Sequence, residues 1–331
     1  NNVAVGYASL NVNTIGTNNV AVGMNTLLAN TTGSSNSAIG YGSLAANTIG
    51  ERNTAVGLQA LASNTTAGSN TSVGYQSLIN NTIGGSNNAL GARSLYSNTT
   101  GVKNNAFGYQ SLYSNVVGIN NSAFGNYTLY ANTTDNNSAF GFKALNDNTI
   151  GTNNSAFGAY ALNFNTTGSS NVAVGRSSLQ NNTIGTQNVA VGHQSLLFTT
   201  TGGNNVGIGY RALYSNTIGT ANTAVGTEAL LPNTTGVSNS AFGYNAMGAN
   251  TIGSKNSAFG RMSLLYNVSG NNNSGFGYRS LFKNTVGSNN SAFGFEALRN
   301  NTTDNNSAFG HNALYANTTG SYNTAVGGWA L

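Results

Sequence analysis

Eight side chains are the usual candidates for acid–base chemistry in this 331-residue sequence. They are six carboxylic acids and two histidines: Glu51, Asp135, Asp147, Glu228, Glu296, Asp304, His193 and His311. No two of the acids are paired in sequence, and the two histidines lie far apart. A metal site needs ligands that converge, and a catalytic triad needs a histidine beside its nucleophile. The sequence therefore predicts no catalytic residue, no metal site and no cofactor, and we expect a protein that is not an enzyme.

Charged residues are scarce, with 11 Lys and Arg against 6 Asp and Glu, for a net charge of +5. Disordered tails carry more charge than this, and the basic residues do not form the patch or stripe that nucleic-acid binding requires. No apolar run approaches the ~20 residues of a membrane-spanning helix. The absence of Cys excludes a disulfide framework. We therefore expect neither a nucleic-acid partner nor a membrane span.

A short repeat organises the whole chain. The glycine that closes "AVG" or "AFG", here called the anchor glycine, recurs twenty times from Gly6 to Gly327. Seventeen of the nineteen intervals match the 17-residue interval from Gly6 to Gly23, and the two that are one residue shorter contain Asp135 and Asp304. A fixed period of this kind is typical of a solenoid, in which each repeat contacts mainly its neighbours. The sequence predicts a single continuous repeat array over residues 1–331.

Positions within the repeat, counted from the anchor glycine, differ in character. Position −4 is Asn in all twenty repeats, and position +7 is Asn in eighteen of nineteen, Thr199 being the exception. Side-chain amides at such positions can form ladders along a stack of coils. Position −1 is always Val, Ile, Leu or Phe, and position +4 is Leu in all but Met247. We predict that positions −1 and +4 point into the core, and that the variable position +2 faces water.

Two secondary structures are compatible with one repeat. Short strands around "NSAFG" and near "SLYSN", joined by Gly and Asn turns, favour an all-β parallel β-solenoid. Leu and Ala in "GYQSLYSNT" would also suit a short helix, which gives a coil built from one strand and one helix. That segment is short, flanked by Gly and rich in Ser, Thr and Asn, so the β-solenoid is the better interpretation.

The stretch "NSAFGYQSL" resembles the head repeats of trimeric autotransporter adhesins (the YadA-like head family) and related repeats of phage and algal-virus tail fibres. It looks like the family motif N-S-V-A-I-G-x-x-A-x-A, and the resemblance covers all twenty repeats. It implies a left-handed parallel β-roll with one coil per repeat, three chains wound into a homotrimer, and receptor binding. The family's repeat is shorter, and "NT[IT]" looks like an extension of one turn.

Position +9 alternates between two kinds of side chain. Odd repeats carry Ile or Val and even repeats carry Thr or Ser. This alternation runs through eighteen successive repeats, from Ile15 and Thr32 to Val286 and Thr303, and Thr319 then breaks it. We predict that odd repeats bury this side chain and even repeats expose it. Either the structure has a 34-residue coil, with odd and even repeats on opposite sides, or a 17-residue coil meets a partner at every second repeat. We predict the 17-residue coil, which agrees with the family's one coil per repeat.

The core of each repeat is thin. Two or three large apolar side chains per repeat, at ~1.5–3 kcal/mol each, hardly offset the ordering of a whole repeat at ~1–2 kcal/mol per residue. We therefore expect a homo-oligomer. Because the chain begins and ends within a repeat, we also expect it to be a segment of a longer fibre protein.

Three non-enzymatic functions fit these observations. The first is a structural or adhesive shaft or head of a cell-surface or virion fibre, which mediates attachment or assembly. The second is the subunit of a self-assembling extracellular filament, since uncapped coil ends present open edges. The third is an ice-binding solenoid, although no regular Thr-x-Thr face emerges from the repeat. All three place the protein outside the cell, at a cell surface or on a virion.

Two sets of residues are candidate sites. The first set is a stripe of aromatics suited to stacking on a surface glycan or receptor, or to packing in an oligomer: Tyr96, Tyr113, Tyr130, Tyr214 and Tyr315. The second set is the asparagines in Asn-x-Thr/Ser sequences at position +7, which even repeats supply and to which the break at Thr319 adds one more. Such asparagines are N-glycosylation acceptors in a secreted protein. They are Asn30, Asn64, Asn98, Asn132, Asn165, Asn233, Asn267, Asn301 and Asn317. The alternative for the second set is an asparagine ladder whose amides are engaged between coils.

Overall fold

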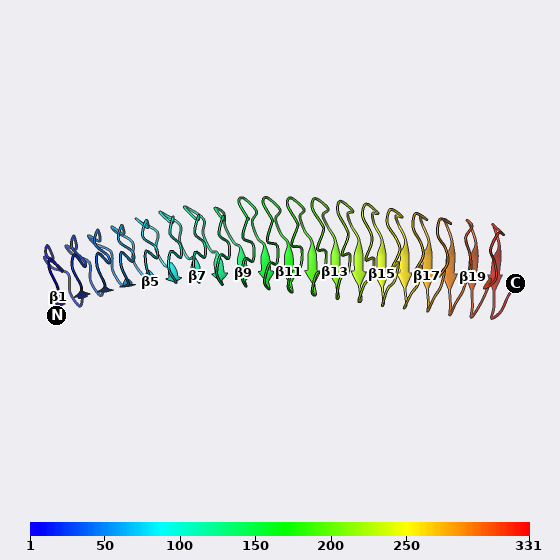
Figure 1. The fold of residues 1–331 in the computed structure, drawn as a ribbon, viewed down its shortest axis with the longest axis horizontal. Coiled ribbons are helices and arrows are strands. Elements are labelled where there is room, and N and C mark those ends of the chain that lie inside the picture. The colour runs from blue at the N-terminus through cyan, green and yellow to red at the C-terminus, as the bar shows by residue number, and fades with distance from the viewer. The chain divides into compact units, whose positions relative to one another are not determined.

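The computed structural model describes residues 1–331. The chain divides into two compact units, an N-terminal unit of Asn1–Thr167 and a C-terminal unit of Gly168–Leu331. The N-terminal unit contains strands β1 to β10, drawn from blue to green in Figure 1, and the C-terminal unit contains β11 to β20, drawn from green to red. Each unit is a stack of coils with one strand per coil, and neither contains a helix.

All twenty strands are three residues long and end just before an anchor glycine. Those of the N-terminal unit are β1 (Val3–Val5), β2 (Val20–Val22), β3 (Ser37–Ile39), β4 (Thr54–Val56), β5 (Thr71–Val73), β6 (Asn88–Leu90), β7 (Asn105–Phe107), β8 (Ser122–Phe124), β9 (Ser138–Phe140) and β10 (Ser155–Phe157). Those of the C-terminal unit are β11 (Val172–Val174), β12 (Val189–Val191), β13 (Val206–Ile208), β14 (Thr223–Val225), β15 (Ser240–Phe242), β16 (Ser257–Phe259), β17 (Ser274–Phe276), β18 (Ser291–Phe293), β19 (Ser307–Phe309) and β20 (Thr324–Val326).

The strand register sets the coil length. Val3 of β1 pairs in parallel with Val20 of β2, and the same 17-residue offset links successive strands within each unit. The offset falls by one between Ser122 and Ser138 and between Ser291 and Ser307, in the repeats that contain Asp135 and Asp304. The predicted parallel β-solenoid with a 17-residue coil is confirmed. The 34-residue coil and the strand-plus-helix coil are excluded.

The interior is narrower than the sequence suggested. Position −2, usually Ala, points inward, and Ala139 is fully buried there. Leu145, at position +4 of the same repeat, is also fully buried. Successive strand residues face opposite sides, so Phe140 at position −1 points outward and is 36% exposed. The predicted inward Leu is confirmed, whereas the predicted inward side chain at position −1 is wrong. A space bounded by Ala, Leu and two asparagines holds no room for Phe.

The "SLYSN" segment does not form the predicted strand. Its backbone instead enters the left-handed region at positions +2 and +4, as at Gln110 (φ 53°) and Leu112 (φ 49°). The Gln110 N–H donates to the Ala92 carbonyl of the preceding coil (3.1 Å), whereas the Leu112 N–H donates to the Thr128 carbonyl of the following coil (3.0 Å). A left-handed residue costs about 1–2 kcal/mol, and these bonds between coils offset that cost.

The anchor glycine is required by its backbone conformation and by close approach of the next coil. Gly125 has φ 135°, and a Cβ atom there would lie 2.7 Å from the Gly141 carbonyl oxygen. Both features recur at the anchor glycines from Gly6 to Gly141 and from Gly175 to Gly310. This explains why position 0 never varies along the chain.

The alternating position +9 is exposed in both kinds of repeat. Ile49 and Ile83 are 51% and 58% exposed, and Thr66 and Thr100 are also exposed. The prediction that odd repeats bury this side chain is therefore wrong for the single chain. Because each repeat is one complete coil, Ile and Thr follow each other in one outward column within each unit.

Candidate interaction surface

Two internal ladders of asparagine hold the coils in register. At position −4, the Asn87 backbone N–H donates to Oδ1 of Asn70 one coil before (2.9 Å), and its Nδ2 donates to the Gly101 carbonyl (2.8 Å). At position +7, Asn81 Nδ2 donates to Asn64 Oδ1 (3.0 Å) and to the Gly84 carbonyl (2.9 Å). These amides are buried and hydrogen-bonded, as buried polar groups must be. The predicted ladders are confirmed. Their hydrogen bonds hold the backbone of each coil in register with the next.

The predicted glycosylation acceptors all lie in the position +7 ladder. Eight of them are fully buried, the exception being Asn317, which is half-buried. Asn30 is typical, since its Nδ2 donates to Asn13 Oδ1 (2.8 Å) and to the Gly33 carbonyl (3.0 Å). A glycan would be attached to that same nitrogen. The geometry favours the ladder interpretation, and glycosylation stays a prediction.

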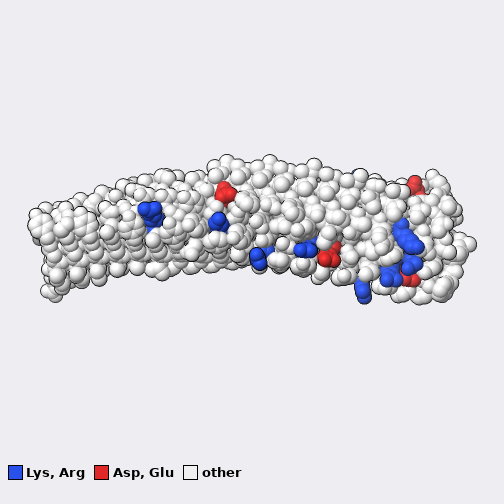
Figure 2. Space-filling model, viewed as in Figure 1, with Lys and Arg blue, Asp and Glu red and all other residues white.

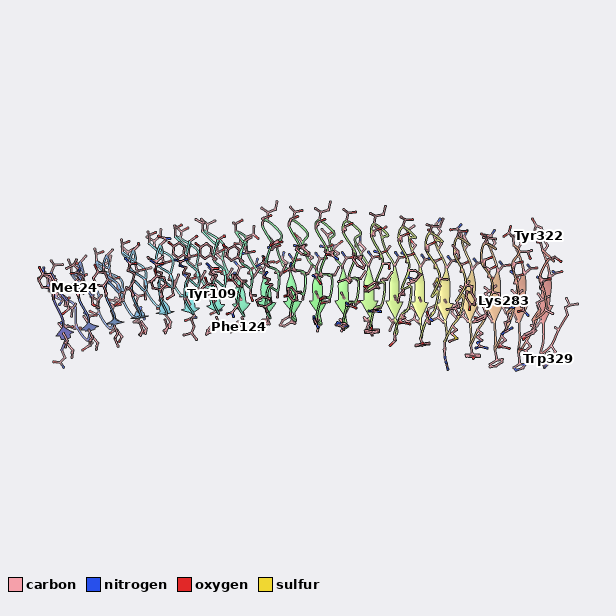
Figure 3. The ribbon with its side chains drawn as sticks, in the orientation of Figure 1. Met24, Tyr109, Phe124, Lys283, Tyr322 and Trp329 are labelled. Atoms are coloured by element: carbon pink, nitrogen blue, oxygen red, sulfur yellow. The ribbon has the colours of Figure 1, made fainter.

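Outward apolar side chains form a strand face along each unit. In the N-terminal unit, Phe107, Phe124, Phe140 and Phe157 stack at centroid distances of 4.6–4.9 Å with interplanar angles of 10° or less. In the C-terminal unit, Phe242, Phe259, Phe276, Phe293 and Phe309 stack in the same way. Phe124 lies at the strand side of the ribbon in Figure 3. This face was not predicted from the sequence, although alternation along a strand with inward Ala would have revealed it.

Position +1 adds a second outward column beside the strand face. It contains Tyr75, Tyr109, Tyr210 and Tyr244, each 41–45% exposed. Both histidines also belong to it, with His193 stacked on Tyr210 at 5.7 Å and His311 stacked on Phe295 at 5.1 Å. His193 thus has one aromatic neighbour and His311 has two, Phe295 and Trp329. No group of three or more potential metal-ligating side chains forms.

The predicted tyrosine stripe at position +5 is divided by the fold. Tyr96, Tyr113 and Tyr130 come together in the N-terminal unit as a half-buried stack, at 5.0 and 5.1 Å with angles of 6° and 7°. Tyr214 instead lies edge-on to Phe198 (5.1 Å, 90°), and Tyr315 lies near Trp329 (6.4 Å). The stripe is thus one three-ring stack and two separate tyrosines, each with an aromatic neighbour.

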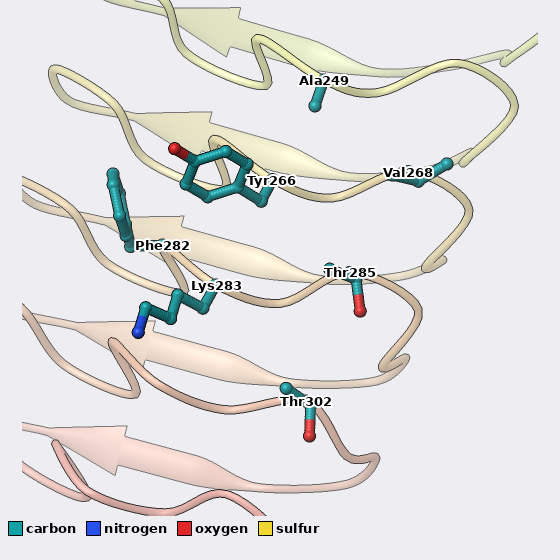
Figure 4. A pocket seen from close by; sticks show the side chains of 7 residues that line it. All are labelled: Ala249, Tyr266, Val268, Phe282, Lys283, Thr285 and Thr302. Atoms are coloured by element: carbon teal, nitrogen blue, oxygen red, sulfur yellow. The ribbon is translucent and has the colours of Figure 1, made fainter.

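Two grooves of the C-terminal unit share one construction. The first, of about 660 Å³, is lined by Asn181, Phe198, Thr200, Ser215, Thr217 and Thr234. The second, of about 540 Å³, is lined by Ala249, Tyr266, Val268, Phe282, Lys283, Thr285 and Thr302 (Figure 4). Phe198 and Tyr266 both hold position +6, four repeats apart, and each lies edge-on to an aromatic of the next coil. Each groove therefore places an outward aromatic ring beside threonines of successive coils.

Charged side chains are few on the face shown in Figure 2, and they gather mainly toward the C-terminal end of the C-terminal unit. There, Glu296 lies 3.7 Å from Arg279 and 3.2 Å from Arg299. In the N-terminal unit, burial raises the pKa of Asp147, and the charge of Lys143 opposes that shift. Asp135 and Asp304 accept backbone N–H groups of the preceding coil, from Ile119 (2.8 Å) and Ser288 (2.7 Å). None of these acids is paired with another as a catalytic couple would be.

Comparison with known proteins gives no assignment for this surface, because no protein-family model matches the chain and no curated protein matches it. The structure contains no helix that could cross a bilayer.

Proposed function

We propose that the chain is the structural or adhesive shaft or head of a cell-surface or virion fibre and that it works as a homo-oligomer. The observation that carries this proposal is the strand face, where large apolar side chains point outward on coil after coil. Such contiguous apolar patches are rare on soluble monomers and mark interaction sites. The motif resemblance supports a left-handed β-roll and a trimer as the form of the oligomer.

The stacked rings favour burial against protein over permanent exposure. The Phe140 ring stacks on Phe124 and Phe157 at centroid distances of 4.6 and 4.9 Å. About a third of the Phe140 side chain is still exposed to water. Burying apolar surface contributes roughly 25 cal/mol per Å², so a column of such rings gives a large cumulative gain on association. The same burial would supply the stability that the thin interior of one coil lacks.

Immunogold electron microscopy tests the location. Antibodies raised against the purified chain are applied to intact cells, and to virions, of the source that encodes it. The proposal predicts gold particles along thin fibres at the outer surface. Labelling that appears only after the cells are opened would contradict it.

A second function, adhesion to a glycan, is favoured by the two matching grooves. An exposed ring at Phe198 or Tyr266 offers its face to the apolar side of a sugar. Nearby threonines offer their hydroxyl oxygens as acceptors, since their protons are donated to carbonyls of the next coil. A glycan array probed with the chain tests this function. Phe198→Ala together with Tyr266→Ala should abolish any signal, whereas the control Phe164→Ala, at position +6 but outside both grooves, should keep it. Equal signals from both variants would exclude the grooves as the binding site.

A further inference from the structure

Positions +8 and +9 form a separate outward strip, which we call the β-branched band. In the N-terminal unit the band takes two residues from each of ten coils between Thr14 and Thr167, and every one of these twenty is Thr, Ile or Val. None is charged, although the chain has 11 Lys and Arg and 6 Asp and Glu elsewhere. β-Branched side chains have few rotamers, so ordering them in a contact costs little entropy.

The backbone of the band is held by converging hydrogen bonds. The Thr31 carbonyl accepts the N–H groups of Thr14 (2.9 Å), Ile15 (3.3 Å) and Gly16 (3.3 Å) from the coil before. It also accepts the Thr14 hydroxyl (3.0 Å). The same hydroxyl-to-carbonyl bond recurs at Thr31, Thr48, Thr65 and Thr82. The position +8 hydroxyl protons are thus used inside the stack, and the band is rigid.

Over the coils from Thr14 to Thr100, the hydrogen bonds inside the chain do not distinguish the Ile coils from the Thr coils. Ile15 N–H donates to the next coil's carbonyl at 3.3 Å, and Thr32 N–H makes the equivalent bond at 3.2 Å. The strand pairs and the anchor glycines repeat at every coil. The position +7 ladder is interrupted at the shortened coil of Asp135, where Asn115 Oδ1 has no partner and Thr134 Oγ1 donates to the Gly151 carbonyl (2.8 Å). An exposed column with a period of two coils therefore needs an explanation outside the single chain. A partner that contacts the Ile coils and the Thr coils differently must have a surface that repeats at the spacing of two coils.

We propose that the β-branched band binds the same band of a second copy of this chain. A two-fold axis perpendicular to the stacking direction, placed between two coils, sets each Ile or Val of one copy against a Thr of the other. The larger side chains then fill the spaces that the smaller ones leave, as in the dry interface of a steric zipper. The contact is isologous and does not use the strand face. It deepens the proposed self-association and rests on it.

Size and charge both support a second copy as the occupant. Twenty residues per copy approach the ~20–30 residues that each side of a standard interface contributes. Two copies with a net charge of +5 repel each other, and the band is a surface where they can meet without bringing like charges together. The strand face of a second copy repeats at every coil. If it packed against the band, it would contact the Ile coils and the Thr coils with unequal fit.

Sedimentation velocity over a range of concentrations tests the pairing with three variants of the whole chain. The filled variant carries Thr32→Ile, Thr66→Ile and Thr100→Ile, which removes the spaces. The inverted variant adds Ile15→Thr, Ile49→Thr, Ile83→Thr, Val117→Thr and Ile150→Thr together with Thr134→Ile and Thr167→Ile. Large and small side chains then alternate again over all ten coils. The control carries Ala45→Leu and Ala62→Leu at position +5, outside both the band and the strand face, where Leu28 and Leu197 hold the same position in other repeats.

The proposal predicts that the filled variant self-associates about tenfold more weakly than the parent, although it is more apolar. It predicts that the inverted variant regains most of the lost affinity and that the control matches the parent. A filled variant that associates as tightly as the parent, or more tightly, would overturn the interdigitated contact but leave a less specific homo-oligomer in place. A parent that stays monomeric would overturn both, and thermal hysteresis from that monomer would assign the band to ice.

Discussion

The backbone N–H of Asn19 donates to Oδ1 of Asn2, 2.9 Å away and one coil earlier. This bond spans one 17-residue coil and places position −4 inside the stack. Its equivalents recur through both units, as from Asn36 to Asn19 (2.9 Å) and from Asn188 to Asn171 (3.0 Å). Since the amides and small side chains occupy the interior, the large side chains of the repeat are left to the outside, where they are available to partners.

Core substitutions should separate the inward position from the outward one. Leu112→Ala removes a fully buried side chain and should lower the free energy of unfolding by about 2–5 kcal/mol. Phe140→Ala removes a stacked but partly exposed ring and should cost only about 1–2 kcal/mol in the dissociated chain. Gln110→Ala should be nearly silent. Urea unfolding followed by circular dichroism measures all three, and equal effects from Leu112 and Phe140 would contradict the assignment.

Restoring the asparagine ladder at its one exception should stabilise the C-terminal unit. Thr199 replaces Asn at position +7, and Asn216 Nδ2 reaches its Oγ1 only at 3.4 Å. In a regular coil the same bond is shorter, as from Asn233 Nδ2 to Asn216 Oδ1 (2.9 Å). Thr199→Asn should raise stability by about 0.5–1.5 kcal/mol, seen as a higher melting temperature. A lower melting temperature would show that the site accommodates Thr for a reason other than the ladder.

An anchor glycine should tolerate no side chain, whereas a glycine at position +2 should. Gly125→Ala puts a Cβ atom 2.7 Å from the Gly141 oxygen at φ 135° and should destabilise the fold by about 3 kcal/mol or more. Gly42→Ala, at φ 64° with its nearest neighbour at 3.7 Å, should cost only the about 1–2 kcal/mol of a left-handed residue. Thermal unfolding of the two variants makes the comparison, and similar losses would refute the close approach as the cause.

Asp147 should make a small contribution to the pH dependence of stability. Burial raises the pKa of this carboxyl in the folded chain, so the folded state holds more protons than the unfolded state between the two pKa values. Stability therefore falls as pH rises through that window. Asp147→Asn should be more stable than the parent at pH 7 by less than about 1 kcal/mol, since the group is partly solvated. The difference should vanish below the unfolded pKa, and a constant difference at every pH would rule out titration as its cause.

The coil length, the strand at "NSAFG" and the asparagine ladders could all be predicted from the period and from the invariance of a few positions. The direction of position −1 could not. Ala139 and Phe140 cannot both point inward, and the choice depends on how much room Leu145 and the ladders leave across the coil. The internal width of the coil is set only when the coil closes, so it cannot be predicted from the sequence of one repeat.

The left-handed turn and the exposed isoleucines were missed for different reasons. Leu112 adopts φ 49° although Leu has no preference for it, so bonds to the adjacent coils decide the conformation. The hydrophobicity of Ile83 suggested burial, whereas its column faces outward in every coil. The grooves at Phe198 and Tyr266 carried a readable signal, because an aromatic at position +6 is followed by an aromatic at position +5 of the next repeat.

Self-association of the folded chain is the central claim, and sedimentation equilibrium of the unmodified protein tests it most directly. The chain has a mass of 33.8 kDa, and its outward apolar columns predict a particle whose mass is a whole multiple of that value at micromolar concentration. Dilution should shift the distribution toward smaller species. A single species of 33.8 kDa at every concentration would contradict the account.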